Sequence, residues 1–446
     1  MKKLVNKALV VLGLCTSYLL AAQQPDGWIQ FNQNYIKLKV TQDNYYRVTS
    51  AELQAAGYPT TSVAVSQLKL YRRGNEVNIR TVANADGVTL SYLEFWGEKN
   101  DGKTDTDLYL PAAQPHQAYN LFTDTATYFL TWSSTTSTRR IVPSGINNNT
   151  GLIPEAYHLA RERILQTSVY SPGRQFGPGS VQKLSDYDAG EGFTGAFLSK
   201  NSAQTFTFTL TDRVIGSVNP HVEAVIVGGN SLTHRVQVEA GPDATSLVTI
   251  DTLTFDGYTH FNYQKEIPAS RVGITGSLLI RFKALGIADA ADRVSLALVD
   301  VVYPQQLVVP VSGQKIFTLE KNSVDRSYIR MGAPTPSAWE FFDVTVPEAV
   351  YKVTQNNLTS RVDLVITPTA NLHRKIVAVQ APATVAGLAA HRFNRINVTG
   401  KQYLIVTHRA LRTPVGGQDP ILAYQQYRES SAGGSYPVLV AEIHDV

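Results

Sequence analysis

The amino-acid sequence predicts a mainly β protein of tandem β-sandwich domains, followed by the start of a truncated α/β domain. Residues 35–40 and 205–210 alternate apolar and polar side chains with the period of two that half-buried strands show. The composition agrees, because the chain holds 22 Tyr and only 2 Met. Near the end, apolar runs at 403–406 and 438–440 enclose a helix-like segment at 421–428, which is the opening β-α-β pattern of a parallel sheet.

The length of 446 residues suggests about three domains. A hydrophobic content of 43% and a charged content of 17% are typical of a chain that folds. The predicted division is a signal peptide at 1–22, an N-terminal β domain at 23–134, a linker or irregular region at 135–190, a β-sandwich at 191–309, a small β domain at 310–399 and the truncated start of an α/β domain at 400–446.

The N-terminal domain begins with the alternating strand at 35–40 and continues into a short helix. Thr49 and Glu52 have the spacing of a capping box, Gly57 can end the helix, and Pro59 prevents its continuation. Further strands are expected at residues 68–71, 77–80, 92–96 and 128–132.

The region that follows is polar at first and then ambiguous. Residues 133–150 are rich in Ser, Thr and Asn, whereas 155–166 fits a helix or a strand. Strands then recur at the intervals of a β-sandwich. They are predicted at 205–210, 222–227, 235–239, 248–253, 278–282 and 293–302.

The N-terminus has the features of a secretory signal. Lys2, Lys3 and Lys7 precede a short apolar core at 8–20, and the small residues that follow suit cleavage. This core is too short to span a bilayer, and no later segment is long enough. Cys15 raises the alternative of a lipoprotein, but the preceding Leu is bulky for a lipid-attachment motif. Cleavage and export are therefore expected.

Charge and cysteine content exclude several classes of function. The net charge is +4, and three of the lysines lie in the predicted signal, so the mature chain is close to neutral and offers no electrostatic case for nucleic acid or anionic lipid. The single cysteine, Cys15, also lies in the predicted signal. A mature chain without it has no disulfide, no thiolate ligand and no thiol nucleophile.

Two motifs suggest ligands but lack the required context. Residues 190–195 match the glycine pattern of dinucleotide-binding loops, yet a polar segment precedes them and a strand follows, so we expect a glycine-rich turn. The loop at 100–107 is rich in Asp and Asn and leaves calcium open as a ligand. It has neither the acidic positions before the glycine nor the closing glutamate of an EF-hand, so a solvated turn is the expected structure.

No residue stands out as catalytic, cofactor-binding or metal-binding. The nine histidines form no metal-binding motif, and no G-x-S-x-G elbow occurs. His408 directly follows an apolar strand, a common place for a catalytic group, but it has no identifiable partner. The four tryptophans could stack on sugars, but core packing is expected for at least three of them. They are Trp28, Trp96, Trp132 and Trp339.

A succession of short segments carries a resemblance over nearly the whole chain. Each segment is weakly specific, and their order gives the match its weight. The segments are residues 28–29, 35–37, 46–48, 53, 57, 70–74, 94–102, 124–130, 190–193, 341–345, 403–408, 427–428 and 438–443. Together they resemble the N-terminal region of type IX secretion system sortases of the PorU type, which belong to the gingipain family of cysteine peptidases.

The resemblance implies a function that this chain holds only in part. In that family a catalytic His and Cys lie further along, in a caspase-like α/β domain, and neither His408 nor His444 matches the place of that histidine. The family's sortases remove the C-terminal sorting domain of exported cargo and attach the cargo to anionic surface lipopolysaccharide. We therefore expect the non-catalytic N-terminal portion of such a peptidase, inactive alone, with cargo and lipopolysaccharide as partners.

Two other hypotheses remain open at the level of sequence. One is a stand-alone exported β-sandwich protein that binds cargo or glycan at the cell surface. The other is an enzyme with a non-thiol nucleophile, which no triad or metal set supports. The apolar run at 438–443 favours the truncated peptidase, because an unpaired apolar strand is an aggregation hazard in a finished binding protein.

Overall fold

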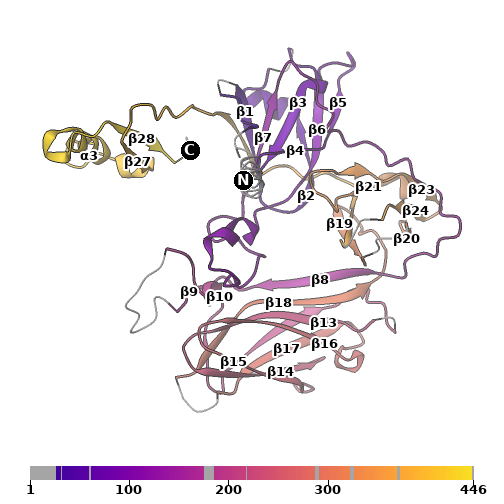
Figure 1. Ribbon diagram of the computed structural model, residues 1–446. Helices are drawn as coiled ribbons and strands as arrows, with labels where there is room; N and C mark the ends of the chain where they lie inside the picture. The colour runs from indigo at the N-terminus through magenta and orange to yellow at the C-terminus, as the bar shows by residue number, and fades with distance from the viewer. Residues whose placement is uncertain are drawn as a thin grey trace, which may run out of the picture.

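The strand-rich prediction is confirmed by the computed structural model of the chain (Figure 1), in which successive β units are followed by one β-α-β unit. The structure describes residues 27–31, 33–59, 62–174, 185–216, 218–286, 291–321, 326–368 and 372–443. The predicted signal peptide and His444 lie outside the described residues.

The N-terminal unit is a sandwich of a five-stranded sheet, ordered β26-β1-β7-β3-β4, and a three-stranded sheet, ordered β2-β6-β5. Alternate side chains such as Ile36, Leu70 and Phe95 fill the core between the sheets, as the period of two predicts. The elements are β1 (Asn34–Val40), β2 (Asn44–Thr49), α2 (Ser50–Ala55), η1 (Val65–Gln67), β3 (Leu68–Arg72), β4 (Asn75–Val77), β5 (Ile79–Ala83), β6 (Leu90–Gly97), η2 (Gly102–Leu108) and β7 (Ala126–Trp132).

The short helix α2 begins where the sequence predicts. The Thr49 side chain accepts a hydrogen bond from the backbone N–H of Glu52, and the Glu52 carboxylate accepts one from the backbone N–H of Thr49. Gly57 follows the helix with a φ of 94°, a conformation that suits glycine.

The central unit is a larger sandwich. One sheet has the order β11-β18-β13-β16 with β8 added to β18, and the other has the order β12-β17-β14-β15. Its elements are β8 (His158–Leu165), β9 (Val169–Pro172), β10 (Glu191–Thr194), β11 (Leu198–Ser199), β12 (Ala203–Thr209), β13 (His221–Gly228), β14 (Thr233–Gly241), β15 (Val248–Asp256), β16 (His260–Glu266), η3 (Ala269–Arg271), β17 (Ser277–Ala284) and β18 (Arg293–Gln305). A small two-stranded sheet of β9 and β10 lies beside it.

The third unit packs a four-stranded sheet, ordered β19-β25-β21-β22, against a three-stranded sheet, ordered β20-β24-β23. Its elements are β19 (Gln314–Leu319), β20 (Ser327–Gly332), η4 (Pro336–Ala338), β21 (Glu340–Asp343), β22 (Tyr351–Lys352), β23 (Gln355–Leu358), β24 (Arg361–Ile366) and β25 (Arg374–Val379). Its core includes Trp339, which is 3% exposed, as expected for a packing residue.

Two strand pairings cross the predicted domain divisions. Strand β26 (Gly387–Arg392), from the segment assigned to the third domain, pairs antiparallel with β1 of the N-terminal unit. Strand β8, from the region predicted as linker, pairs with β18 of the central sandwich. The segment left open between helix and strand is thus a strand at His158–Leu165, because its alternate residues Ala160 and Ile164 pack on the sandwich core.

The N-terminal and third units share a hydrophobic core. Tyr45 and Trp96 pack with Phe342, Val350 and Val377, and the rings of Tyr45 and Phe342 stack with centroids 4.0 Å apart. The side-chain amide of Gln314 strengthens this contact by pairing with both backbone groups of Tyr45, at 2.8 Å each. These contacts fix the two units against each other.

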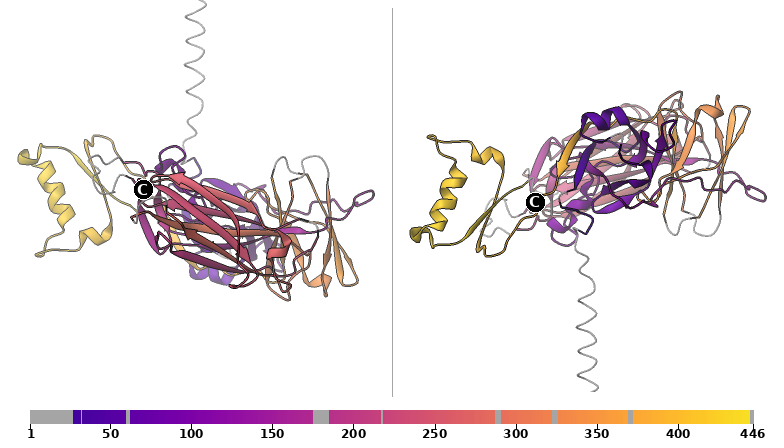
Figure 2. Two further views of the ribbon diagram at one scale, coloured as in Figure 1. Left: turned by 90° about the horizontal axis from the view of Figure 1, so that it is seen from below. Right: turned by 90° about the horizontal axis from the view of Figure 1, so that it is seen from above.

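The C-terminal unit is a β-α-β motif that lies apart from the β units (Figure 2). Strands β27 (Tyr403–Thr407) and β28 (Val438–Glu442) are parallel, as predicted. Between them lie η5 (Arg409–Arg412), α3 (Pro420–Glu429) and η6 (Ser431–Gly433). The side chain of Asp419 caps α3, and Arg412 joins Asp419 to Glu442, which ties the connection to the second strand.

The shared core generates the first prediction. Replacement Phe342→Ala should lower the free energy of unfolding by about 3–5 kcal/mol, because it leaves a cavity between two units in a fully buried cluster. The matched control is Phe122→Ala, whose ring is 69% exposed and which should change stability by less than about 0.5 kcal/mol. Chemical denaturation measures both. Equal effects of the two variants would show that this core does not contribute as described.

Candidate binding cleft between the β units

A cleft of about 1130 Å³ lies where all three β units meet. Its floor is the outer face of the central sheet, formed by strands β8, β13 and β18. One wall comes from the N-terminal unit through Asp43, Trp96 and Glu98. The opposite wall comes from β19 and β25 of the third unit. The shared core of the N-terminal and third units fixes the two walls of the cleft against each other.

An ion-pair network organises the floor of the cleft. The side chain of Asp300 is fully buried on β18 and accepts hydrogen bonds from Arg161 and Arg163 of β8. Arg163 holds both carboxylate oxygens, with its Nε 3.0 Å from Oδ1 and its Nη2 2.7 Å from Oδ2. Arg161 also bonds Glu223 of β13. A buried carboxylate needs such partners, so the network fixes both arginine side chains at the cleft surface.

Glu223 stays ionised over the whole physiological range. Hydrogen bonds from His221 and Arg161 outweigh burial and lower the pKa of the Glu223 carboxyl to about 2. The His221 Nε2 lies 3.1 Å from the carboxylate. Glu223 is therefore a fixed anion beside fixed cations, and this pairing suits binding better than proton transfer.

His158 lines the cleft and is almost fully buried. Its Nε2 lies 3.0 Å from the Gln305 side-chain oxygen, and its ring packs edge-on against Phe317 with centroids 4.8 Å apart. Burial lowers the pKa of the His158 imidazole to about 4. The ring is thus neutral at pH 7 and acts as part of the packed junction between β8 and β19.

The walls add cations that have no ion-pair partner in the described part of the chain. Lys315 of β19 and Lys375 of β25 both line the cleft, and neither forms an ion pair there. Burial lowers the pKa of the Lys315 ammonium, whose Nζ lies 5.0 Å from the Phe317 ring centroid. Asp43 of the N-terminal wall interacts electrostatically with Lys375, and burial raises the pKa of the Asp43 carboxyl.

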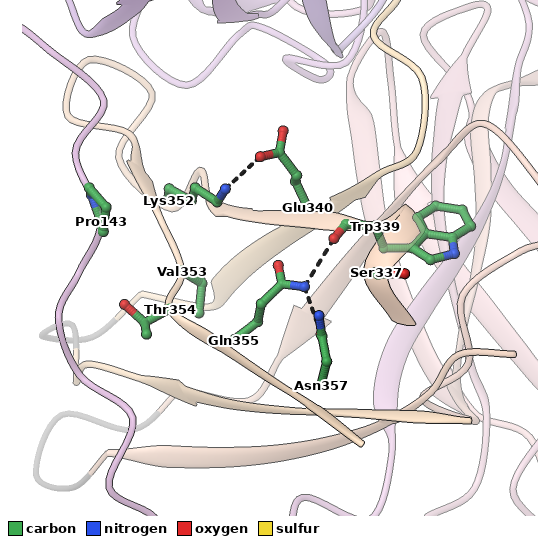
Figure 3. A pocket seen from close by; sticks show the side chains of 9 residues that line it. All are labelled: Pro143, Ser337, Trp339, Glu340, Lys352, Val353, Thr354, Gln355 and Asn357. Atoms are coloured by element: carbon green, nitrogen blue, oxygen red, sulfur yellow. Dashed lines mark hydrogen bonds and ion pairs between the residues drawn. The ribbon is translucent and has the colours of Figure 1, made fainter. Parts of the chain in front are cut away.

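A second, smaller hollow of about 330 Å³ lies on the third unit (Figure 3). The Gln355 side-chain amide donates to the Trp339 carbonyl at 3.1 Å and to the Asn357 side-chain oxygen at 2.8 Å. The Gln355 Oε1 is buried and has no hydrogen-bond partner. A Glu340–Lys352 ion pair and Pro143 complete the rim. This arrangement offers amide donors and acceptors to a polar neutral ligand.

The residues singled out from the sequence do not meet at one site. His408 caps η5 through its ring, which accepts from the Ala410 N–H at 3.1 Å, and it is exposed. In the loop at 100–107, Asp105 is buried and accepts from Asn120 and from the Leu121 N–H, while Asp101 pairs with Lys103 and Arg73. These carboxylates are engaged within the protein.

Other motifs and residue types suggested by the sequence form no further site within the described residues. No group of three His, Cys, Asp or Glu residues there could hold a metal ion. Of the glycine pattern at 190–195, which was expected to be a turn, Gly190 lies in a turn and residues 191–194 form strand β10, with Gly190 and Gly192 at positive φ. Of the tryptophans, Trp96 and Trp339 are buried, and Trp28 and Trp132 are half-buried.

The cleft residues were missed at the level of sequence because they are far apart along the chain. Arg161 and Asp300 are separated by 139 positions. One signal was present: Asp300 interrupts an apolar strand whose other residues are buried, and a carboxylate in such a strand requires a cationic partner. The sequence alone does not say which arginine supplies it.

These features define a class of molecule: a multidomain β protein with an appended β-α-β unit and a polar cleft between its domains. No family model and no curated protein matches the chain. The arrangement is similar to that in the crystal structure of dimeric latent PorU from Porphyromonas gingivalis, with a TM-score of 0.63 and 14% sequence identity. The match covers 92% of this chain and 37% of that one, so the chain spans little more than a third of its neighbour's length.

Other solved structures match only parts of the chain. A carbohydrate-binding module CBM36 in complex with calcium and xylotriose covers 31% of it, with 15% identity and a TM-score of 0.20. The CBM36-1 domain of a xylanase from a termite hindgut metagenome (Trinervitermes trinervoides) covers 32%, also at 15% identity and a TM-score of 0.20. These likenesses are too weak to support an argument about binding. Among the described residues, no helix is long and apolar enough to cross a membrane.

Burial of His158 generates a prediction about pH. Because its folded pKa, about 4, lies below the ordinary 6.5, the neutral ring stabilises the fold fully above pH 6.5, and this stability is lost as pH falls toward 4. The loss should be on the order of 3 kcal/mol. Replacement His158→Gln should remove this part of the pH dependence. Denaturation curves between pH 7 and 4 test it, and parallel losses in both proteins would contradict it.

Proposed function

We propose that this chain is the non-catalytic, β-rich portion of a gingipain-type cysteine peptidase that resembles the sortases of type IX secretion. The observation that supports this best is the similarity of arrangement over 92% of the chain to latent PorU. At 14% identity that similarity concerns the fold, so activity, cargo and location belong to the proposal. The proposed location is the outer membrane surface, with export directed by the predicted signal at residues 1–22.

In this proposal the β units hold exported cargo while a peptidase domain packs on the β-α-β unit. Support comes from the surface of that unit. Leu404 and Val406 on β27 are 57% and 54% exposed, and Leu411 in the following connection is 62% exposed. Contiguous exposed apolar side chains mark a surface that another structure covers. Layers of a larger α/β sheet would cover these faces in a peptidase of this type.

The central cleft is the proposed place where cargo docks. It is the largest hollow among those described, it joins all three β units, and it presents Lys315 and Lys375 beside the arginines of its floor, together with the carboxylates of Asp43, Glu98, Asp212 and Glu320. This mixed lining suits a polar polypeptide whose acidic side chains pair with the two lysines. Anionic surface lipopolysaccharide remains a proposed second partner, by resemblance alone.

Absence of peptidase activity is the first test. The purified chain, after removal of the signal, should cleave no peptide substrates with Arg, Lys or other residues at the scissile bond, because its only cysteine lies within that signal. The measurement is fluorogenic peptide cleavage with and without a thiol-alkylating reagent. Cleavage that the reagent abolishes, in material free of other proteases, would overturn the non-catalytic assignment.

Cargo capture is the second test. The double variant Lys315→Glu/Lys375→Glu should weaken binding of a purified C-terminal sorting domain about tenfold, because it reverses both free charges of the cleft wall. The matched control is Lys283→Glu, on the outer face of the opposite sheet of the central sandwich. Surface plasmon resonance measures both. Equal binding by the two variants would exclude the cleft, and no binding by the unmodified chain would reject the cargo-holding role.

A second candidate function is that of an exported β-sandwich protein that binds glycan at the cell surface. The specific observation in its favour is the hollow of Figure 3, which is lined by the polar side chains of Ser337, Thr354, Gln355 and Asn357. Amides and hydroxyls supply both donors and acceptors, and a sugar hydroxyl uses both.

The hypothesis of glycan binding is tested separately. A panel of soluble neutral hexasaccharides of glucose, xylose and mannose is the probe, with saturation-transfer NMR as the measurement. Replacement Gln355→Ala should abolish any transfer, whereas Asn356→Ala should leave it intact because that exposed residue points to the other side of β23. The absence of transfer from the whole panel, or equal transfer in both variants, would dismiss this function.

A further inference from the structure

Strand β8 is an edge strand that lies inside the central cleft. Among the described residues it pairs with β18 and with no other strand. Six consecutive residues of β8, from 158 to 163, line the cleft. Neighbouring side chains of a strand point to opposite faces, so a cavity that contacts six in a row runs along the edge of the strand.

The hydrogen-bond pattern shows which backbone groups of β8 face the cleft. On the far side of β18, Val214 N–H donates to the Pro304 carbonyl and Gln306 N–H donates to the Asp212 carbonyl. Gln305 therefore directs its backbone N–H and C=O groups toward its partner His158. From this pair onward, hydrogen-bonded and non-hydrogen-bonded residue pairs alternate along the two strands. Residues 159, 161 and 163 consequently direct their N–H and C=O groups away from β18, toward the cleft.

The side chains beside this edge carry positive charges on one face of β8 and a negative charge on the other. Arg161 and Arg163 lie on the floor side and are about two-fifths exposed, at 40% and 39%. Each guanidinium has more donors than its bonds to Asp300 and Glu223 use. Glu162 lies on the other face of the strand, on the side opposite the two arginines.

We propose that an extended segment of a partner polypeptide adds to β8 as a further strand, with acidic side chains at alternate positions beside Arg161 and Arg163. The backbone groups of residues 159, 161 and 163 would supply the ladder, and cross-strand pairing with the two arginines would supply the register. This inference rests on the proposed role of the cleft in holding a partner, and it specifies the backbone conformation and the charge pattern of what is held.

Charged residues on edge strands can also prevent pairing with other chains, which is the alternative role for Arg161 and Arg163. Protection of this kind is needed where an edge is open to other molecules on all sides. The edge of β8 instead lies beside walls from the N-terminal and third units, which limit the directions from which another molecule can reach it. Its arginines are also fixed by Asp300, which favours selection by charge over general repulsion.

Two variants at one position separate backbone pairing from side-chain charge. Arg161→Pro removes the outward N–H and the guanidinium, whereas Arg161→Ala removes only the guanidinium. Both leave the Arg163–Asp300 pair and the ladder to β18, since the N–H of residue 161 faces the cleft. The probes are two short fluorescein-labelled peptides, one of alternating glutamate and threonine and one of alternating lysine and threonine, in fluorescence anisotropy with the signal-free chain.

The glutamate peptide should bind the unmodified chain, and the lysine peptide should bind at least about tenfold more weakly. Arg161→Ala should weaken the glutamate peptide about threefold, and Arg161→Pro by a further tenfold or more. Circular dichroism confirms that each variant is folded. Equal binding by the two variants would overturn strand addition, as would no binding of the glutamate peptide. Either result leaves the capture of a sorting domain by the cleft cations as a separate question.

Discussion

The antiparallel pairing of β26 with β1 is the constraint on which the rest of the arrangement depends. After three β units the chain returns to its first strand, and six residue pairs from Asn34↔Arg392 to Lys39↔Gly387 hold it there. An aromatic group secures the same place, because Phe393 packs on Tyr35 and Trp28 with ring centroids 4.9 and 5.3 Å apart. This return fixes the place from which the chain continues to the β-α-β unit. Together with the core that contains Tyr45 and Phe342, it holds the β units in one body.

The central cleft is a consequence of that closure. Its walls come from units that are far apart in sequence, and its floor is the outer face of a sheet that would otherwise be open to solvent. The fully buried Asp300 then has a structural role, because it holds two arginines in place at low conformational freedom. Fixed charges and a strand edge in one cleft are the features on which the proposed holding function rests.

The sequence predicted what depends on neighbouring residues. The alternation at 35–40, the Thr49–Glu52 capping box and the parallel strands around α3 all follow from local patterns, and the structure has each of them. The partners of β8 and β26 could not be predicted, because an edge strand with mixed side chains fits several sheets equally well. The candidate cleft escaped prediction for the same reason: its residues come from strands that only the tertiary fold brings together.

Hydrogen exchange of backbone amides, followed by mass spectrometry on the unmodified chain without its signal, tests the central claim most directly. If the return of the chain closes the β units, the amides of β26 that bond to β1 should exchange far more slowly than those of the exposed segment at 394–402. Fast exchange of residues 387–392 beside a protected β1–β7 pair would show that β26 does not belong to the sheet, and the account of the closed body would be wrong.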